Sequence, residues 1–586
     1  MDERTAAPRR EDPVYVLGVN SGPHDGSAAL LRDGELVAML EQERLSRNRY
    51  AFGESPADAI EACLGEAGIG LGEVSQIAVG WDVPQLVALE SDQPFCEDDF
   101  VRWLLGANAE GCSRTPPLRY VSHHLAHAAS AFHTSGFDVA AILVVDGRGE
   151  AVATTLAAGG PGGIDVLETW GTELSLGHLY GWASEWAGLT MWGTGKLMGL
   201  ASYGVADGPT PLRTTADGYT IEGGPPADSP VRHHYLLMRS RLRHAFRGSY
   251  PFAEGDPADT MTYAGFAASV QRSLELVLLR LAEKARRETG HAALALAGGV
   301  ALNCTVNGVI ARSGIFDEIW IPPIPHDAGV SLGAAIVADR SVRADRQQLP
   351  VRLAHARWAP STRDDADALQ PLTGCTTERC DDERLSAVVA AHLASGRLVG
   401  WWQGRAEVGQ RALGARSILG DPRTRAMHVR LNRAKGREVW RPLAPAVLAE
   451  HTAEFFAGAL PLAAEFMLVA WPIRQQARTR LPAAVHVDGS ARPQVVDRSH
   501  GRYRRVLEAF YELTGVPALL NTSFNVAGEP LVHSRADAVS TFLRSDLDVL
   551  VVDDLVVVKP ESRRSSRLGA ARVTVKNHPF VPWARS

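Results

Sequence analysis

Cysteine is scarce in this chain of 586 residues, and its six cysteines include no Cys-x-x-Cys pair. Zinc ribbons and zinc fingers need such pairs, so the sequence excludes them. The scarcity also fits a reducing compartment. A signal peptide is missing too, because Arg9 and Arg10 are followed by Glu11, Asp12 and Pro13 in place of an apolar segment. We therefore expect a cytoplasmic protein.

Long apolar runs and an excess of positive charge are absent as well. No run approaches the roughly 20 apolar residues that span a bilayer. The formal net charge is -7, whereas general nucleic-acid binding needs a basic surface. We therefore expect neither a membrane nor a nucleic acid among the partners. The length exceeds what one hydrophobic core supports, which predicts two or more domains.

One short pattern occurs twice along the chain. Residues 14–19, 27–31 and 35–41 predict three strands joined by glycine turns, and residues 141–146, 151–157 and 164–170 predict three more. A helix is expected over 56–68 and a buried strand over 77–81. The repetition predicts a duplicated α/β fold. The alternative is a chance similarity between two hairpins.

Two histidines and two aspartates are spaced as metal ligands. His123 and His127 are four residues apart, which places them on one face of a helix. Asp146 ends the apolar strand 141–146, and Asp327 lies between a strand at 319–322 and a helix that continues to 338. A helix-face histidine pair alone is more often structural. Together with two carboxylates that follow strands, it suits a divalent transition metal.

Three glycine-rich segments predict a nucleotide site in the same half of the chain. One is 193–201, one follows the strand 293–297 and precedes a helix, and one is the turn 146–150. None is a Walker P-loop or a Rossmann fingerprint, and a single glycine turn usually only makes a turn. The residues we assign to nucleotide binding here are Gly195, Lys196, Gly199, Gly298, Gly299 and Asn303.

A dense basic region follows in the second half. Residues 405–441 contain ten Lys and Arg against three acids, in a chain that is acidic overall. A solvated helix face usually intersperses acids. Arginine forks suit phosphate oxyanions, so a phosphate or triphosphate pocket explains the region better. An RNA groove is a third interpretation, and the few interleaved aromatic residues disfavour it.

Two further polar segments belong to this second half. The loop 486–492 contains His486 and Arg492, and the strand 518–521 opens into Asn521, Ser523 and Asn525. Polar groups at the carboxyl end of a strand are a common ligand site. Residues 340–384 lack periodicity and predict a linker, with the second domain under way near residue 381 as a helix (385–395) and a strand (398–402). A basic tail begins near residue 562.

Long motifs then resemble one family. They are the segments 18–20 and 24–30, His-His-Leu-Ala-His at 123–127, Asp-Gly-Arg-Gly-Glu at 146–150, Gly-Lys-Leu-Met-Gly-Leu-Ala at 195–201, Gly-Gly-Val-Ala-Leu-Asn at 298–303, and the segments 409–419, 437–442 and 521–525. Over about residues 14–560 the chain resembles the NodU/CmcH family of O-carbamoyltransferases. The resemblance implies a duplicated actin-like domain, similar to threonylcarbamoyl-tRNA transferase, over 1–355, and a YrdC-like α/β domain over 356–586.

The resemblance also implies a reaction and its cofactors. Carbamoyl phosphate and ATP, the latter with Mg²⁺, would give carbamoyladenylate and pyrophosphate in the second domain. The first domain would move the carbamoyl group to a hydroxyl of a small natural product, such as an antibiotic, and release AMP. The family binds iron(II) at positions that match His123, His127, Asp146 and Asp327. We expect a monomer or a homodimer.

Individual roles follow from this scheme. The adenylate is a better leaving group than phosphate, and positive groups would stabilise the charge on it. The residues assigned to the adenylation pocket are Arg411, Arg416, Lys435, Arg441, His486, Arg492, Asn521, Ser523 and Asn525, with Arg411 and Lys435 taken as catalytic. Attack by a hydroxyl needs a general base, for which His24 in the first glycine turn is the candidate. A structural turn histidine is the alternative.

Three other functions compete with this one. A tRNA threonylcarbamoylating enzyme shares the metal set, but the acidic charge and the fused basic region favour a small acceptor. A hydrogenase-maturation carbamoyltransferase carries an acylphosphatase-like domain and Cys-x-x-Cys zinc fingers, which this sequence lacks. An actin-like kinase or scaffold leaves the basic region 405–441 unexplained.

Overall fold

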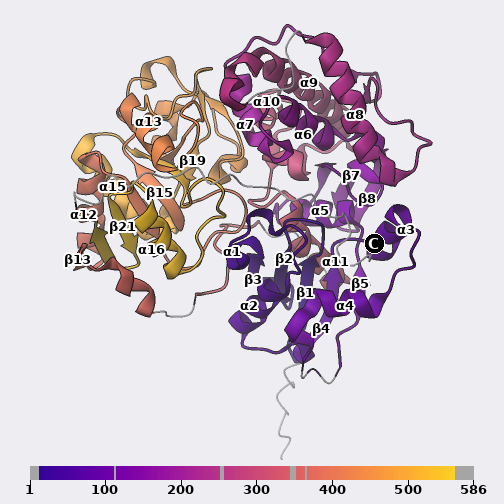
Figure 1. Ribbon diagram of the computed structural model, residues 1–586, viewed down its shortest axis with the longest axis horizontal. Coiled ribbons are helices and arrows are strands. Elements are labelled where there is room, and N and C mark those ends of the chain that lie inside the picture. Colours follow the sequence, from indigo (N-terminus) through magenta and orange to yellow (C-terminus); the bar gives the residue numbers. More distant parts are fainter. Residues whose placement is uncertain are drawn as a thin grey trace, which may run out of the picture.

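Two five-stranded sheets with the same strand order form the first domain (Figure 1). The computed structural model describes residues 12–110, 112, 114–250, 257–343, 352–362 and 366–560. The first sheet has the order β3-β2-β1-β4-β5. Its strands are β1 (Tyr15–Asn20), β2 (Ser27–Arg32), β3 (Glu35–Glu41), β4 (Val74–Val79) and β5 (Leu118–Tyr120).

The second sheet repeats the first. Its order is β8-β7-β6-β11-β12, and in both sheets the first three strands pair antiparallel while the others add in parallel. Its strands are β6 (Ala140–Val145), β7 (Val152–Gly160), β8 (Gly163–Gly171), β11 (Ala293–Ala297) and β12 (Glu318–Trp320). Because both sheets share one topology, the duplication is confirmed, and the first domain has the actin-like fold.

Two helices lie between the sheets, and one of them, α5 (His123–Phe132), carries the two histidines of the predicted metal set. Helix α5 packs against β6 and β11, and α11 (Val330–Val342) packs against β1, β2 and β4. The two helices also contact each other closely at Gly333, where a Cβ would stand 1.8 Å from the carbonyl oxygen of Ala126. Only glycine allows this approach. The first-sheet side also has α1 (Glu43–Ser46), α2 (Ala57–Ala67), α3 (Val83–Glu90) and α4 (Glu97–Leu105).

A helical layer covers the second sheet and is drawn in purple to magenta in Figure 1. Its long helix begins at Ala264, after a 3-10 helix over residues 257–263. The layer also holds the short hairpin β9 (Leu212–Thr214) and β10 (Tyr219–Ile221). Its helices are α6 (Leu176–Trp186), α7 (Thr194–Ala201), α8 (Val231–Ser249), α9 (Ala264–Thr289) and α10 (Cys304–Arg312).

The second domain is built on one mixed sheet of eight strands, in the order β13-β22-β21-β14-β15-β20-β16-β19. Its strands are β13 (Thr376–Arg379), β14 (Val399–Trp402), β15 (Arg416–Gly420), β16 (Ala444–Leu448), β19 (Gln494–Val496), β20 (Ala518–Ser523), β21 (Val549–Val552) and β22 (Leu555–Val558). A two-stranded ribbon, β17 (Trp471–Pro472) and β18 (Ser490–Ala491), stands apart. This sheet with its helices is the expected YrdC-like α/β domain.

The helices of the second domain are α12 (Asp382–Ala394), α13 (Arg425–Ala434), α14 (Thr452–Phe455), α15 (Arg502–Thr514) and α16 (Arg535–Arg544). The expected linker over 340–384 is wrong in part, because it contains β13, which pairs with β22 at the edge of the sheet. A four-residue strand of threonine, glutamate and arginine has no apolar alternation, so no local pattern marks it. The basic tail expected from residue 562 lies outside the described residues.

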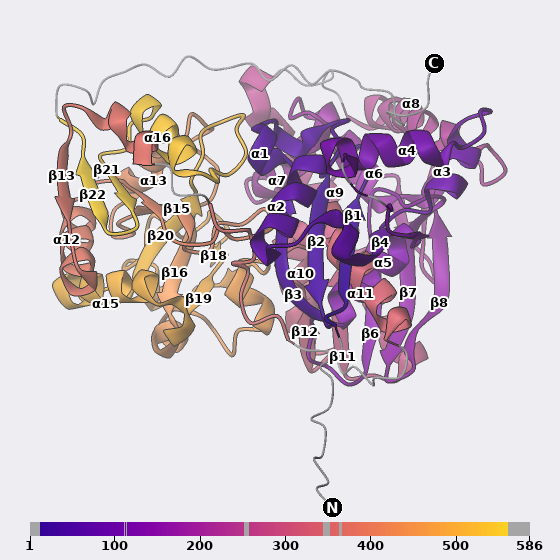
Figure 2. The same ribbon diagram turned by 90° about the horizontal axis from the view of Figure 1, so that it is seen from below.

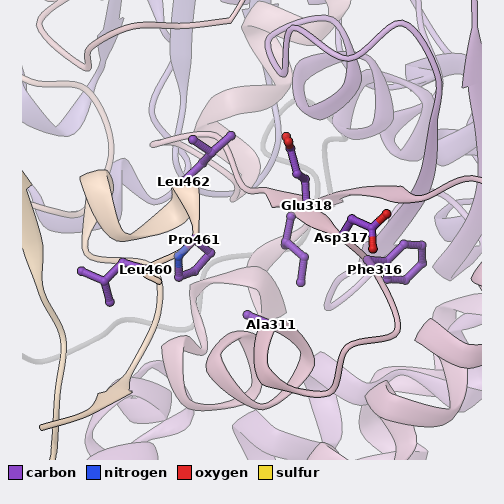
Figure 3. A pocket seen from close by; sticks show the side chains of 8 residues that line it. Ala311, Phe316, Asp317, Glu318, Leu460, Pro461 and Leu462 are labelled. Atoms are coloured by element: carbon purple, nitrogen blue, oxygen red, sulfur yellow. The ribbon is translucent and has the colours of Figure 1, made fainter. Parts of the chain in front are cut away.

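The two domains share a continuous apolar seam, and Figure 2 shows the two domains side by side. Trp320 of β12 packs edge-on against Phe466, with 5.8 Å between ring centroids. The backbone N–H of Ala470 donates to the carbonyl of Cys304 at 2.8 Å. A shallow surface pocket opens along this seam between residues 311–319 and 460–462 (Figure 3), and it contains none of the predicted site residues.

Candidate metal and anion sites

The four predicted metal ligands meet between the two halves of the first domain. One nitrogen or oxygen from each of His123, His127, Asp146 and Asp327 lies within 4.8 Å of the others, and all four residues are buried. Nε2 of His123 stands 3.3 Å from Oδ2 of Asp146 and 3.1 Å from Nε2 of His127. Oδ1 of Asp327 is 3.7 Å from Nε2 of His127. The helix α5 and the ends of β6 and β12 thus converge.

This set fits a divalent metal. Ligands at about 2.0–2.2 Å from one ion must lie about 3–4 Å from each other, which is the spacing found here. Burial opposes ionisation of Asp146, but its hydrogen bond with His123 and the charge of His127 hold the pKa of the carboxyl below its ordinary range. Nδ1 of His127 is buried without a hydrogen-bond partner. Two imidazoles and two carboxylates suit iron(II) and related ions.

Neighbouring groups fix the ligands. The N–H of Gly299 donates to Oδ1 of Asp146 at 2.7 Å, which leaves Oδ2 directed at the histidines. Gly298 adopts φ +90, and a Cβ there would stand 2.2 Å from the carbonyl oxygen of Val145. The glycine turn 298–299 therefore orients a metal ligand, a role that sequence reasoning missed. Such outer contacts commonly set ligand geometry.

His24 lies beside the metal cluster. Its Nδ1 is 2.9 Å from Oδ2 of Asp25 and 3.9 Å from Oδ2 of Asp327. Burial opposes protonation, yet the hydrogen bond with Asp25 and the charge of Asp327 raise the pKa of His24 to about 9. Its ring packs edge-on against Trp192, 4.8 Å between centroids. The structure therefore places the candidate base next to the cluster.

Of the other glycine-rich residues, Lys196 and Gly199 contact the second domain, Asn303 is buried and Gly195 is exposed. Lys196 Nζ pairs with Glu438 at 2.8 Å, and Gly199 accepts from His486 through its carbonyl, at 3.1 Å from Nε2. Gly195 has open space where a Cβ would stand. Asn303 caps α10 by accepting from the N–H of Val306. Helix α7 is thus an interdomain contact, and Asn303 is engaged in the fold.

The basic region contributes a cluster of cations that repel one another. Burial and the neighbouring Arg492 lower the pKa of Arg411 to about 9. Burial, Arg441 and Arg492 lower that of Arg437 well below its ordinary range. Nε of Arg411 and of Arg492 is buried without a hydrogen-bond partner. Packed cations with unused donors suit a polyanion. We call Arg411, Lys435, Arg437, Arg441 and Arg492 the cationic cluster.

Lys435 connects this cluster to the end of β20. Its Nζ donates to Oγ of Ser523 at 3.2 Å and to Oδ1 of Asn525 at 2.8 Å. Burial, followed by Arg437 and Arg441, lowers its pKa well below the ordinary value. Asn521 is fully buried and donates to Gln494 at 2.7 Å, while its Oδ1 has no hydrogen-bond partner. Ser523, Asn525 and Lys435 are therefore brought together as expected.

Arg416 lies apart from the cationic cluster. It is completely buried, lies 3.9 Å over the ring of Trp402, and donates to the carbonyls of Gln403, Gly404, Ala415 and His533. Because its donors are used by backbone oxygens, we leave Arg416 out of the phosphate pocket. Its role is to hold the chain around β15.

Two residues of the first domain border the cationic cluster and were missed. Arg49 lies over the ring of Tyr50 at 4.9 Å, and its charge contributes to lowering the pKa of both Lys435 and Arg441. Tyr50 in turn packs on Trp192, which touches His24. The rings of Tyr50 and Trp192 thus connect the cationic cluster with the metal ligands. No local signal marks residues 49–50, because the contact joins segments almost 400 positions apart.

Known proteins are similar to this chain over most of its length. The profile for the carbamoyltransferase N-terminus matches residues 15–98 and 104–336, and that for the carbamoyltransferase C-terminus matches 390–559. Nodulation protein NolNO of Sinorhizobium fredii is 38% identical over 562 residues, covering 92% of this chain and 80% of that protein. Nodulation protein U of Azorhizobium caulinodans is 30% identical over 551 residues, covering 88% and 94%.

A solved structure is similar at a greater distance. The crystal structure of full-length HypF in the phosphate- and nucleotide-bound form aligns at TM-score 0.33 and 13% identity, covering 56% of either chain. A likeness of this size carries no statement about ligands. Within the described part of the chain, no helix combines the length and apolar character needed to cross a membrane.

Proposed function

The chain belongs to the carbamoyltransferase family, and from that premise we propose that it is an ATP-dependent O-carbamoyltransferase with two separate sites. It is a transferase that moves a carbamoyl group. The proposal adds the activation of that group by ATP and a small-molecule hydroxyl as its acceptor. The observation that carries it is the cationic cluster, which is crowded and desolvated and in which Nε of Arg411 and of Arg492 has no hydrogen-bond partner.

The first half-reaction is assigned to the second domain. Water releases inorganic phosphate from carbamoyl phosphate and leaves carbamate. A carbamate oxygen then attacks the α-phosphorus of ATP as the bond to pyrophosphate breaks, which gives carbamoyladenylate. Arg411, Arg441 and Arg492 bind the phosphates, whose charge relieves the repulsion in the cluster. Lys435, Ser523 and Asn525 bind the carbamoyl end, with the unpartnered Oδ1 of Asn521 behind them. Mg²⁺ accompanies ATP.

The second half-reaction is assigned to the first domain. His123, His127, Asp146 and Asp327 would hold iron(II) or another divalent ion, which supplies positive charge near the leaving AMP. The acceptor hydroxyl attacks the carbamoyl carbon and AMP departs. We assign to His24 the removal of the hydroxyl proton, and because its pKa is raised it must first lose its own proton.

The acceptor that we propose is a small natural product with a free hydroxyl, of the antibiotic, polyketide or glycoside type. This part follows from the family resemblance and from the acidic overall charge. We propose neither a nucleic acid nor a membrane as a partner. The one macromolecular partner in the proposal is a second copy of the chain. A cytoplasmic location is proposed because cysteine is scarce, as in proteins of a reducing compartment.

The experiment is an incubation of the purified protein with ATP, Mg²⁺ and labelled carbamoyl phosphate, without an acceptor. Pyrophosphate and carbamoyladenylate that both depend on carbamoyl phosphate are the expected products. Release of ADP, or nucleotide turnover that ignores carbamoyl phosphate, would overturn the proposal and favour an actin-like kinase.

A further inference from the structure

A buried ion pair of the first domain holds the backbone of the second. Oε1 of Glu41, at the end of β3, accepts from the N–H of Gly409 at 2.7 Å. Nη2 of Arg44, in α1, donates to the carbonyl of Gly409 at 2.6 Å and to Oε1 of Glu41 at 2.9 Å. Both polar groups of Gly409 are thus bound by residues more than 360 positions away in the sequence. Helix α1 lies at the border with the second domain in Figures 1 and 2.

The pair is unusual in its setting. Glu41 is 3% exposed and Arg44 is 5% exposed. A buried ion pair is often no better for stability than an apolar pair of similar size, since both charges lose their water. Here the two charges are arranged around one peptide group of another domain. This arrangement indicates a positioning role.

The loop that contains Gly409 is also contacted from its opposite side. Gly409 adopts φ +91, and a Cβ on it would stand 2.4 Å from the carbonyl oxygen of Pro323. Pro323 belongs to the segment that leads to the metal ligand Asp327. Within the loop, the carboxylate of Glu407 accepts from the N–H groups of Leu413 and Ala415 at 2.5 and 3.2 Å. The loop is therefore fixed between its own acid and the first domain.

Arg411 follows Gly409 by two residues, and its guanidinium also contacts the first domain. Nη2 donates to the carbonyl of Leu302 at 3.3 Å, while Nε is buried and free of hydrogen bonds. Both the backbone before Arg411 and the guanidinium itself are thus held by residues outside the second domain.

We propose that Glu41 and Arg44 position Arg411 for adenylation, so that the first domain completes the pocket of the second. This inference rests on the proposed function. Glu41 and Arg44 touch no substrate in this scheme. They act through the Gly409 peptide, and their loss changes the aim of Arg411 without removing it.

The first test compares two variants of α1 and its C-terminal cap. Arg44→Lys keeps the charge but replaces the planar guanidinium, whose Nη2 donates to both Gly409 and Glu41, with a shorter and more flexible ammonium. We expect kcat/KM for carbamoyl-phosphate-dependent pyrophosphate release to fall about tenfold or more, as small misplacements do, with metal content unchanged. Arg47→Met is the matched control. Arg47 also crosses the interface, to the carbonyls of Pro530 and Leu531, but it does not touch the Gly409 loop.

The control should stay within about twofold of the parent protein. If both variants lose the same activity, the pair only holds the domains together and the positioning role is overturned. Unchanged activity in Arg44→Lys overturns it too.

A double-mutant cycle distinguishes action through Arg411 from any general effect. Arg411→Lys is the second background, chosen to leave residual pyrophosphate release. If Arg44 acts by aiming Arg411, Arg44→Lys costs much less in that background than in the parent protein. Equal fold losses in both backgrounds contradict the proposal.

Two precautions keep the result readable. Should Arg44→Lys fail to fold, Gly409→Ala moves the same loop from the Pro323 side, and the same kinetics and cycle apply. The parent protein is measured alongside. If the parent protein releases pyrophosphate in a carbamoyl-phosphate-dependent way and the effects of the two substitutions are additive, only the positioning role is overturned. Absence of that release in the parent overturns the proposed function itself.

Discussion

His127 places its Nε2 3.1 Å from that of His123 and 3.7 Å from Oδ1 of Asp327. Removing this ligand leaves two carboxylates and one imidazole in a buried space shaped for four. In His127→Ala we expect the affinity for iron(II) and the rate of carbamoyl transfer to fall by about a hundredfold or more. Pyrophosphate release should persist. Metal analysis of the purified variant and the two half-reaction assays measure this.

His124→Gln is the control for that variant. The His124 ring bonds Thr155 through Nδ1, at 2.8 Å, and is not among the four clustered ligands. It should retain its metal. Equal loss of both half-reactions in His127→Ala would contradict two separate sites.

Arg411 carries the complementary prediction for the second site. Arg411→Ala removes a desolvated cation with an unused Nε from the cationic cluster. We expect pyrophosphate release to fall about a hundredfold or more, as loss of a single stabilising donor does elsewhere, with metal content equal to that of the parent. Full pyrophosphate release in this variant would remove Arg411 from the pocket.

At the scale of elements, segments with a strong local pattern could be predicted, and segments that depend on a partner far away in the sequence could not. The strands of both meanders follow local apolar periodicity, and each was expected within a few residues of its bounds, while the histidine helix was expected from the spacing of His123 and His127. β13 was missed because a short polar edge strand exists only through its partner β22. The metal set was visible because each ligand lies in or next to a regular element: the histidines in α5, Asp146 after β6 and Asp327 shortly before α11.

The anion site was visible in the sequence only in part, because it too depends on contacts between distant segments. Charge density marked residues 405–441, but it could not separate Arg416, whose donors serve backbone carbonyls, from Arg411, whose Nε is unused. Charge density also could not indicate that Arg49 and Glu41, two residues of the first domain, lie near this region. These distinctions depend on which backbone oxygens lie nearby, and that is settled by tertiary packing.

The packing of α5 on α11 gives a prediction about these two elements. Gly333→Ala puts a methyl group 1.8 Å from the carbonyl oxygen of Ala126 and forces the helices apart. α5 carries His123 and His127, and Asp327 precedes α11, so the ligands separate too. We expect about 1–3 kcal/mol lower stability and weaker metal binding. Denaturant unfolding and metal titration measure both.

Gly195→Ala is the matched control on α7, because no atom lies within 4 Å of its added Cβ. It should bind metal like the parent and be at least as stable, because alanine is favoured over glycine in a helix. A Gly333→Ala protein that binds metal as tightly as the parent would show that the α5–α11 spacing does not control the site.

At the scale of the whole molecule, the apolar seam decides how the protein unfolds. Separate domains usually meet through modest, polar interfaces and unfold in separate steps. Here one apolar cluster includes residues of both domains, with Trp320 packed on Phe466, and Asn307 donates to the carbonyl of Leu468 at 2.8 Å. The buried pair Glu41–Arg44 and Gly409 add a second junction.

We therefore expect a single cooperative transition on heating, because exposing the seam costs either domain part of its core. Differential scanning calorimetry should give equal calorimetric and van't Hoff enthalpies if unfolding is reversible. Phe466→Ala, which empties one side of the contact with Trp320, should lower the transition temperature of the whole chain and not split the peak. Two resolved peaks in the parent protein, only one of them moved by Phe466→Ala, would mean that the domains unfold independently and that the seam contributes little to either.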